Sequence, residues 1–283
     1  MENTLEVKDI SVNFDNFSLK DVSFNVKKGT IMGFIGENGA GKTTTLKLIL
    51  NSFARENGSI NVFGKDNIKD EIYVKNYVGY VPAESYLLSN RTILQHEETF
   101  SYFYDNWDKE LFRECLRKWK IDKNMKASEL STGMKTKTML ALALAHEPQL
   151  LILDEPTAGL DPVARMELLD ELRTFVEDGE KSIIISTHIT SDLDKVADYI
   201  TLIHNGRILE SDSIDIIQER YAVVRGEVSL LEENEDKFVG VKKWDNSFEG
   251  LILRENLIGD LKKLQISLPN IEELLTFHIW GNK

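Results

Sequence analysis

A glycine-rich stretch close to the N-terminus constrains this sequence more than any other feature. It matches the pattern G-x-x-x-x-G-K-[ST] and comprises Gly36, Glu37, Asn38, Gly39, Ala40, Gly41, Lys42, Thr43 and Thr44. A short apolar run at residues 31–35 precedes it, and Leu46, Ile49 and Leu50 follow at the spacing of one helix face. A strand, this loop and a helix, in that order, predict a loop that binds the phosphates of a nucleotide.

The residue types in this loop suit a triphosphate and a metal ion. The glycines can adopt positive φ angles, which turn successive backbone N–H groups inward at the N-terminus of a helix. Lys42 is expected to reach the β- and γ-phosphates, and the Thr43 hydroxyl is expected to bind Mg²⁺. A turn without a ligand is the alternative, but such a turn has no use for Lys42 followed by Thr43.

Polar side chains follow two further apolar runs. Residues 150–153 are aliphatic and lead into Asp154 and Glu155, and residues 183–185 are isoleucines that lead toward His188. The carboxyl ends of parallel strands meet at the sheet edge where such folds bind ligands. We therefore expect Asp154 to hold Mg²⁺, Glu155 to polarise the attacking water, and His188 to contact the γ-phosphate.

The aromatic residue Phe14 lies in a turn-rich segment ahead of the glycine loop. A ring held there can stack on a purine, so Phe14 is our candidate for contact with adenine. The alternative is that Phe14 fills the core between the N-terminal strands.

Composition narrows the class of protein. The chain has 283 residues, 42% of them hydrophobic, which is enough for one large domain and an appendage. The apolar runs are too short to cross a bilayer, and the N-terminus lacks the pattern of a secretory signal. With a single cysteine, Cys115, no intramolecular disulfide can form. The net charge of −13 disfavours nucleic acid and anionic lipid as partners, so we expect a cytoplasmic protein that reaches a membrane through a protein partner.

The hydrophobic patterns predict an α/β fold with a mixed sheet. Alternation at residues 5–10 and 19–26 predicts antiparallel N-terminal strands beside a parallel core. Helical spacing at 92–120 and 135–145 predicts a helical subdomain over about residues 85–147, with Ser131 as a helix N-cap. Asn205 and Gly206 predict a hairpin turn.

The C-terminal part has a pattern of its own. Alternating segments at 223–230, 238–241 and 251–253 predict strands, and residues 268–275 predict a closing helix. We therefore expect a nucleotide-binding domain over residues 1–220 and a small α+β extension over residues 221–283.

The ordered motifs resemble those of the ATP-binding cassette (ABC) family, most of all the ATPase subunits of bacterial exporters with separate membrane subunits. The glycine loop resembles the Walker A motif of that family. Residues 150–154 resemble Walker B, and Glu155 follows at the catalytic position. Residues 158–161, which end in Asp161, are similar to the D-loop, and His188 is similar to the switch histidine.

The segment 130–134 is similar to the signature motif of the family but departs from its usual form. The usual form is Leu-Ser-Gly-Gly-Gln, whereas this chain has Leu-Ser-Thr-Gly-Met. Ser131 keeps the hydroxyl and Gly133 keeps the close approach of backbone, while Thr132 differs. The resemblance therefore still implies contact with a phosphate, with altered affinity or rate.

A second departure concerns the metal site. The family usually has a glutamine after the strand that matches residues 80–82, and that glutamine contacts Mg²⁺. This chain has Ala83 and Glu84 there. Either Glu84 replaces the missing oxygen ligand, or the contact is absent.

The resemblance implies an ATP-hydrolysing subunit that uses Mg²⁺, dimerises around two ATP molecules and drives separately encoded membrane subunits. The dimer is a homodimer or a heterodimer with a paralogous ATPase, and peptides, antibiotics or lipid-like compounds are the implied substrates. The subunit would lie on the cytoplasmic face of the cell membrane. A soluble switch in repair or translation, or a scaffold cassette with weak hydrolysis, are the other functions considered. The single cassette and the acidic composition disfavour the soluble switch.

Overall fold

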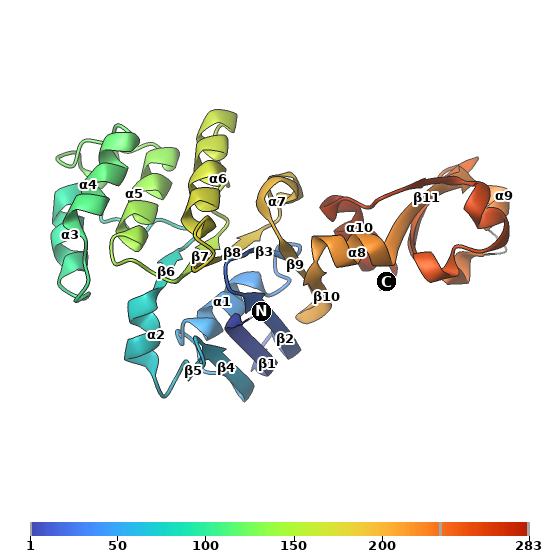
Figure 1. Ribbon diagram of the computed structural model, residues 1–283, viewed down its shortest axis with the longest axis horizontal. Coiled ribbons are helices and arrows are strands. Elements are labelled where there is room, and N and C mark those ends of the chain that lie inside the picture. Colours follow the sequence, from blue (N-terminus) through green and yellow to red (C-terminus); the bar gives the residue numbers. More distant parts are fainter. Residues whose placement is uncertain (1, 232–233, 282–283) are drawn as a thin grey trace.

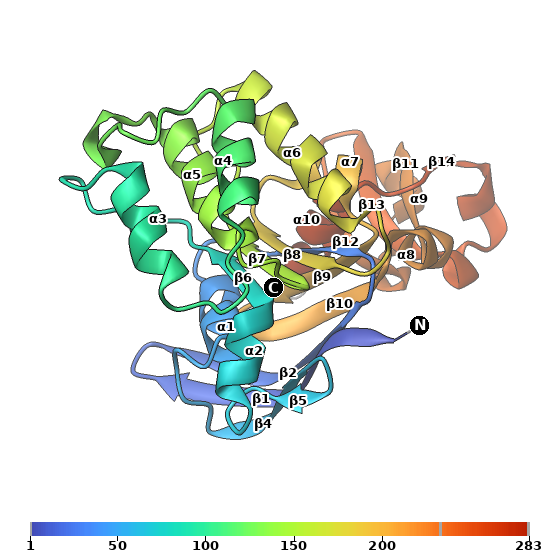
Figure 2. The ribbon, with the colours of Figure 1, turned by 60° about the vertical axis from the view of Figure 1, so that its left-hand side comes forward.

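The computed structural model describes residues 2–231 and 234–281, which form three β-sheets with helices around them (Figure 1). The central sheet lies between a layer formed by the N-terminal strands with α1 (Lys42–Ile49) and a layer of helices (Figures 1 and 2). The third sheet lies at the C-terminal end of the molecule. Within the described residues, every helix falls short of the length and apolar content that a bilayer crossing needs.

The central sheet is mixed, as predicted. Its strand order is β10-β9-β3-β8-β7-β6. The mutually parallel strands are β3 (Ile31–Ile35), β6 (Val78–Val81), β7 (Leu150–Asp154), β8 (Ser182–Thr187) and β9 (Tyr199–His204). Strand β10 (Arg207–Ser213) runs antiparallel to β9 across the predicted turn, where Asn205 and Gly206 both have positive φ.

Alternate residues of each central strand supply the cores on the two faces of this sheet. In β7, Leu150 and Ile152 pack with the N-terminal strands and α1, whereas Leu151 and Leu153 pack with the helices on the opposite face. Those helices are α5 (Thr132–Leu144), α6 (Pro162–Val176) and α7 (Thr190–Val196). Burial on both faces explains why the strand is an unbroken aliphatic run.

The N-terminal strands pair with one another, in the order β2-β1-β4-β5. They are β1 (Asn3–Phe14), β2 (Phe17–Lys27), β4 (Asn57–Val62) and β5 (Lys65–Asp66), and all their pairings are antiparallel. The antiparallel prediction is confirmed, with the difference that these strands form their own sheet. Its apolar face, which includes Leu5, Val7 and Phe24, is buried against β3 and α1.

A helical region follows β6 and covers one end of the molecule (Figure 1). Its helices are α3 (Ile93–Ser101), α4 (Lys109–Lys118) and α5, while α2 (Glu71–Tyr77) precedes β6. The helical pattern at 92–120 is divided into separate helices, because the side chains of Thr92 and Asp108 cap α3 and α4. Helix α5 begins at Thr132, earlier than the predicted residue 135, because Ser131 Oγ accepts a hydrogen bond from the Met134 N–H at 3.2 Å.

The C-terminal extension is a sheet with a helix packed on it. The strand order is β12-β13-β11-β14, and the strands are β11 (Tyr221–Glu227), β12 (Phe238–Lys243), β13 (Ser247–Leu253) and β14 (Gln265–Ser267). The helices here are α8 (Ile214–Arg220), α9 (Val228–Leu231) and α10 (Ile271–Gly281). Short 3₁₀ turns cover Ala127–Glu129, Glu235–Lys237, Arg254–Asn256 and Gly259–Lys263. The strand predicted at 223–230 ends at Glu227, and α9 follows it.

Apolar contacts join the extension to the rest of the chain. Leu274 and Phe277 of α10 belong to the same buried cluster as Leu193 and Val196 of α7. The predicted boundary at residue 220 coincides with the end of α8, but the apolar core continues across it. The division into residues 1–220 and 221–283 therefore stays a prediction.

Candidate functional site

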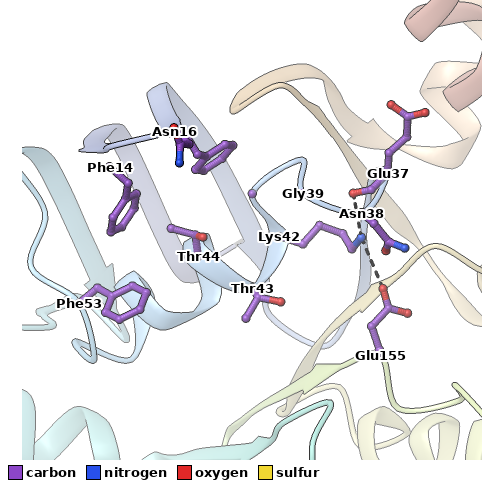
Figure 3. A pocket seen from close by; sticks show the side chains of 12 residues that line it. Phe14, Asn16, Glu37, Asn38, Gly39, Lys42, Thr43, Thr44, Phe53 and Glu155 are labelled. Carbon is purple, nitrogen blue, oxygen red and sulfur yellow. Dashed lines mark hydrogen bonds and ion pairs between the residues drawn. The ribbon is translucent and has the colours of Figure 1, made fainter.

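The loop between β3 and α1 lines a cleft of about 700 Å³, which we call the loop cleft (Figure 3). Its lining residues are Phe14, Asn16, Phe17, Glu37, Asn38, Gly39, Gly41, Lys42, Thr43, Thr44, Phe53 and Glu155. The fold thus brings the predicted aromatic residue, the glycine loop and the end of β7 to one place. These segments are far apart in the sequence.

Backbone conformation and close packing explain the glycines of this loop. The φ angle is +81° at Gly39 and +113° at Gly41, in the region that favours glycine. At Gly41 a Cβ atom would lie 2.6 Å from Leu19 Cδ2 and 2.8 Å from Phe17 Cζ. At Gly36 a Cβ atom would lie 2.3 Å from the Ile203 carbonyl oxygen of β9. The neighbouring strands therefore hold the loop in its curved shape.

Lys42 is the buried cation of the loop cleft, in the first turn of α1. Its Nζ donates hydrogen bonds to the carbonyl oxygens of Gly36 at 2.8 Å and Glu37 at 3.3 Å. The same Nζ lies 3.4 Å from Glu155 Oε1 (Figure 3). An ammonium group among backbone amides at a helix N-terminus is a binding site for an anion such as phosphate.

Asp154 lies at the end of β7 and is 1% exposed. Thr43 Oγ1 donates a hydrogen bond to Asp154 Oδ2 at 2.7 Å, and Ser186 Oγ donates one to Oδ1 at 2.6 Å. Burial, with a contribution from the charge of Asp154, raises the pKa of Tyr80 to about 12. Hydroxyl and carboxylate oxygens are ligands that Mg²⁺ prefers, so the pair of Thr43 and Asp154 fits a magnesium ion.

Glu155 follows directly, in a backbone conformation that is uncommon for a residue with a side chain. Its φ is +50°, and its N–H donates to the Ser186 carbonyl oxygen at 2.8 Å. Its carboxylate lies between two basic groups, with Oε1 near Lys42 and Oε2 2.8 Å from His188 Nδ1. Because a carboxylate accepts, Nδ1 of His188 carries the hydrogen of this bond. The geometry holds the Glu155 carboxylate in one orientation.

Aromatic side chains line the end of the loop cleft away from Glu155 (Figure 3). Phe14 is 44% exposed and Phe53 is 39% exposed. Their ring centroids lie 5.9 Å apart with 61° between the ring planes. The sequence analysis missed Phe53 and Asn16. An aromatic residue just beyond the phosphate-loop helix is the signal that would have indicated Phe53.

The predicted signature residues line a different cleft, of about 490 Å³, which we call the signature cleft. Ser131, Thr132 and Gly133 lie there together with Asp161. Asp161 caps α6 by accepting hydrogen bonds from the N–H groups of residues 163 and 164, and these bonds, that of residue 164 first, lower the pKa of its carboxyl. The lining residues of the two clefts differ, so a single chain does not bring its signature residues to its own Lys42.

The remaining predicted residues have other surroundings. Ala40 is buried behind the loop, and its carbonyl oxygen accepts from the Gly206 N–H at 3.0 Å. The Glu37 carboxylate lies 3.3 Å from Nδ1 of His204, a residue of β9 that the sequence analysis missed. Glu84 is exposed after β6 and is not among the residues that line the loop cleft, so the structure does not bring it to the pair of Thr43 and Asp154.

Comparisons with known proteins agree with this geometry. The sequence profile of a family described as "ABC transporter" matches residues 19–158. The chain is 32% identical over 222 residues to the ABC transporter ATP-binding protein YtrB of Bacillus subtilis, covering 78% of this chain and 76% of that protein. It is 32% identical over 205 residues to the bacitracin transport ATP-binding protein BcrA of Bacillus licheniformis, covering 72% and 67%. A solved ATP binding subunit of an ABC transporter is 30% identical, with a TM-score of 0.70 over 76% of this chain and 92% of that one.

Proposed function

We propose, from the premise that this chain belongs to the family of ABC transporter ATP-binding subunits, that it is the ATPase of an exporter whose membrane-spanning subunits are separate chains. Membership makes the chain an ATPase that drives transport. The observation that carries the residue roles is the meeting of Lys42, Glu155 and His188 in the loop cleft, beside Thr43 and Asp154.

Binding of the triphosphate falls to Lys42 and the backbone N–H groups of the glycine loop. Lys42 is buried, and its charge therefore acts on a phosphate with little screening by water. The loop amides at the N-terminus of α1 add the partial positive charge of the helix. Together these groups hold the β- and γ-phosphates and favour the charge that builds up on them during hydrolysis.

Activation of water falls to Glu155. Its carboxylate is held by Lys42 on one oxygen and by His188 on the other, so one orientation is fixed before the substrate binds. A carboxylate in this position accepts a proton from the water that attacks the γ-phosphate. Nε2 of His188, on a ring that is 48% exposed, is our candidate for contact with the γ-phosphate.

The magnesium ion would be held by Thr43 and Asp154. Asp154 is almost fully buried, and the hydroxyl groups of Thr43 and Ser186 fix the direction of both its oxygens. The ion, when bound, offsets the charge of the β- and γ-phosphates. At the other end of the loop cleft, Phe14 would stack on the adenine ring.

A two-fold dimer would complete each site. Since the signature cleft is separate from the loop cleft in one chain, we infer that Ser131, Thr132 and Gly133 of one subunit face the glycine loop of another. Val163 and Met166 lie beside the signature residues and are 66% and 60% exposed. Exposed apolar side chains next to this cleft support its burial against a second subunit, identical or paralogous.

A membrane-spanning partner and an exported substrate complete the proposal. Tyr102 and Phe103, after α3, are 87% and 71% exposed and contact each other at 5.8 Å between centroids. Such an exposed aromatic pair supports docking of a partner on the helical region. The relative BcrA is named for bacitracin transport, which supports a peptide, antibiotic or lipid-like substrate for this chain. The subunit would then lie on the cytoplasmic face of the membrane.

The substitution Glu155→Gln tests the catalytic assignment. It removes the base but keeps the shape of the side chain, so we expect ATP turnover to fall by about 10²–10⁴-fold while ATP binding remains. Gel filtration with ATP should show a dimer that persists, because hydrolysis no longer separates the subunits. The exposed Glu177→Gln is the matched control and should hydrolyse ATP like the wild type. Equal turnover by both variants would remove Glu155 from the role of base.

Co-purification tests the transport assignment. A tagged Glu155→Gln protein, loaded with ATP, would be recovered from detergent-solubilised membranes of the native host. We expect an integral membrane protein to come with it, and the identity of that protein indicates the substrate class. Recovery of ribosomes or of soluble protein alone would leave the ATPase in place and exclude the exporter.

A further inference from the structure

Phe53 is a large apolar side chain that the fold leaves partly open at the end of α1. It lies in the turn after that helix, is 39% exposed, and lines the loop cleft. The glycine loop precedes α1 and Phe53 follows it, so one short helix joins the phosphate end of the cleft to the aromatic end. A helix of eight residues is about 12 Å long, which sets the two ends apart by a fixed distance.

Phe53 and Phe14 together form what we call the aromatic corner. Their ring planes are inclined by 61° at a centroid distance of 5.9 Å, so they meet as two walls and not as a parallel stack. Lys47 of α1 places its Nζ 5.1 Å from the centroid of the Phe53 ring, an attractive cation–π contact that holds the ring from the side of the helix. In Figure 3 both rings stand at the end of the cleft away from Glu155.

The chemistry of the aromatic corner limits how it can recognise a ligand. Phenyl rings have no hydrogen-bond donor or acceptor, so they interact with the face and the apolar edge of a flat ring. Stacking of this kind depends on the area of the base and not on its exocyclic groups. Purines offer more ring area than pyrimidines.

We propose that Phe53 is a second wall of the base subsite and a specificity-determining residue, which with Phe14 selects purine nucleoside triphosphates by ring area. One wall stacks on the purine face, and the other closes the subsite against the purine edge. The inference rests on the proposed ATPase function and assigns to that site a residue that the motif pattern did not include. Phe53 acts on the base alone, at the opposite end of the cleft from Lys42.

The test separates the base from the phosphates. Dissociation constants for ATP, GTP and inorganic tripolyphosphate would be measured by calorimetry for the wild type, Phe53→Ala and Phe53→Trp. We expect Phe53→Ala to weaken ATP and GTP by about fivefold or more, and by the same factor, because stacking on an aromatic side chain is lost. Tripolyphosphate should bind within about twofold of the wild type, and Phe53→Trp should bind both nucleotides at least as well as the wild type.

Tyr73→Ala is the matched control. Tyr73 is 42% exposed, has Lys65 Nζ 5.8 Å from its ring centroid and contacts the Tyr77 ring at 5.0 Å, so its surroundings resemble those of Phe53. It lies on α2, outside the lining of the loop cleft. Loss of an exposed aromatic side chain of this kind should leave all three dissociation constants unchanged.

Two results would overturn the inference. One is that Phe53→Ala binds ATP as tightly as the wild type. The other is that it weakens tripolyphosphate as much as ATP, which would mean that Phe53 supports the loop and does not touch the base. Failure of the exporter function would show elsewhere, as wild-type protein with normal base dependence that recovers no membrane protein.

Discussion

At the scale of single residues, two glycines of the same loop make a contrast. Gly41 has a φ of +113° and packs so closely on Leu19 and Phe17 that a Cβ atom would overlap both side chains. Gly39 also has positive φ, but a Cβ atom there would meet nothing within 4 Å among the described residues. Backbone strain is therefore common to both positions, and a steric clash is confined to Gly41.

We expect Gly41→Ala to lower ATP affinity at least about tenfold, since the loop must move away from β2 to admit the methyl group. Gly39→Ala should cost only the backbone term, about 1 kcal/mol of unfolding free energy, and should retain most of the affinity for ATP. Calorimetric titration and urea unfolding of both variants measure the two effects. Equal affinities would show that the contact with β2 does not shape the loop.

At the scale of secondary-structure elements, His146 connects the end of α5 to β6. It is 2% exposed, its ring stacks on Tyr104 at 4.1 Å between centroids, and its Nε2 lies 3.3 Å from the Val78 carbonyl oxygen. Burial lowers the pKa of His146 from 6.5, against the opposing effect of hydrogen bonds to backbone carbonyls. The folded protein therefore binds this proton less readily than the unfolded chain does.

The sign of this shift predicts that acid weakens the junction of α5 and β6. The stabilisation is complete above about pH 6.5 and is lost as pH falls toward the lower folded-state pKa, with a slope of at most about 1.4 kcal/mol per pH unit. The variant His146→Phe keeps a ring but cannot titrate. Between pH 7.5 and 5.5, urea unfolding should show a smaller loss of stability for the variant than for the wild type. Identical losses would contradict the assignment, because other groups titrate alike in both proteins.

At the scale of the whole molecule, the C-terminal extension shares its core with the nucleotide-binding part. Leu274 of α10 is 1% exposed and packs in one cluster with residues of α7, the helix that follows His188. We expect Leu274→Ala to lower the free energy of unfolding by about 2–5 kcal/mol, because it leaves a cavity in that core. Ile258→Ala, at a position 53% exposed in the same extension, is the control and should change stability by less than about 0.5 kcal/mol.

The same core decides how unfolding proceeds. If the extension and the nucleotide-binding part unfold together, Leu274→Ala should lower the midpoint of ATP-binding loss as well as that of the circular dichroism signal. Separate midpoints in the Leu274→Ala protein would show that residues 221–283 fold on their own. That result would support the sequence-based boundary at residue 220 over the continuity of the core.

The sequence by itself determined the features that depend on neighbouring residues. The glycine loop, with Lys42 and Thr43 at the start of a helix, is a local pattern whose chemistry follows from spacing alone. Asp154, Glu155 and His188 were predictable as a group, because each follows an aliphatic run and parallel strands present their carboxyl ends at one edge of a sheet. The structure brings all five residues together beside the loop cleft.

Only the tertiary structure decided the contacts between segments that no pattern relates. Phe53 meets Phe14 because α1 packs against the N-terminal sheet, and Ser186 reaches Asp154 because β8 is the neighbour of β7. The separation of Ser131 from Lys42 likewise depends on where the helical region packs. Strand order and layer packing follow from the burial of many side chains at once, and hydrophobic patterning along one segment does not specify which other segment will cover it.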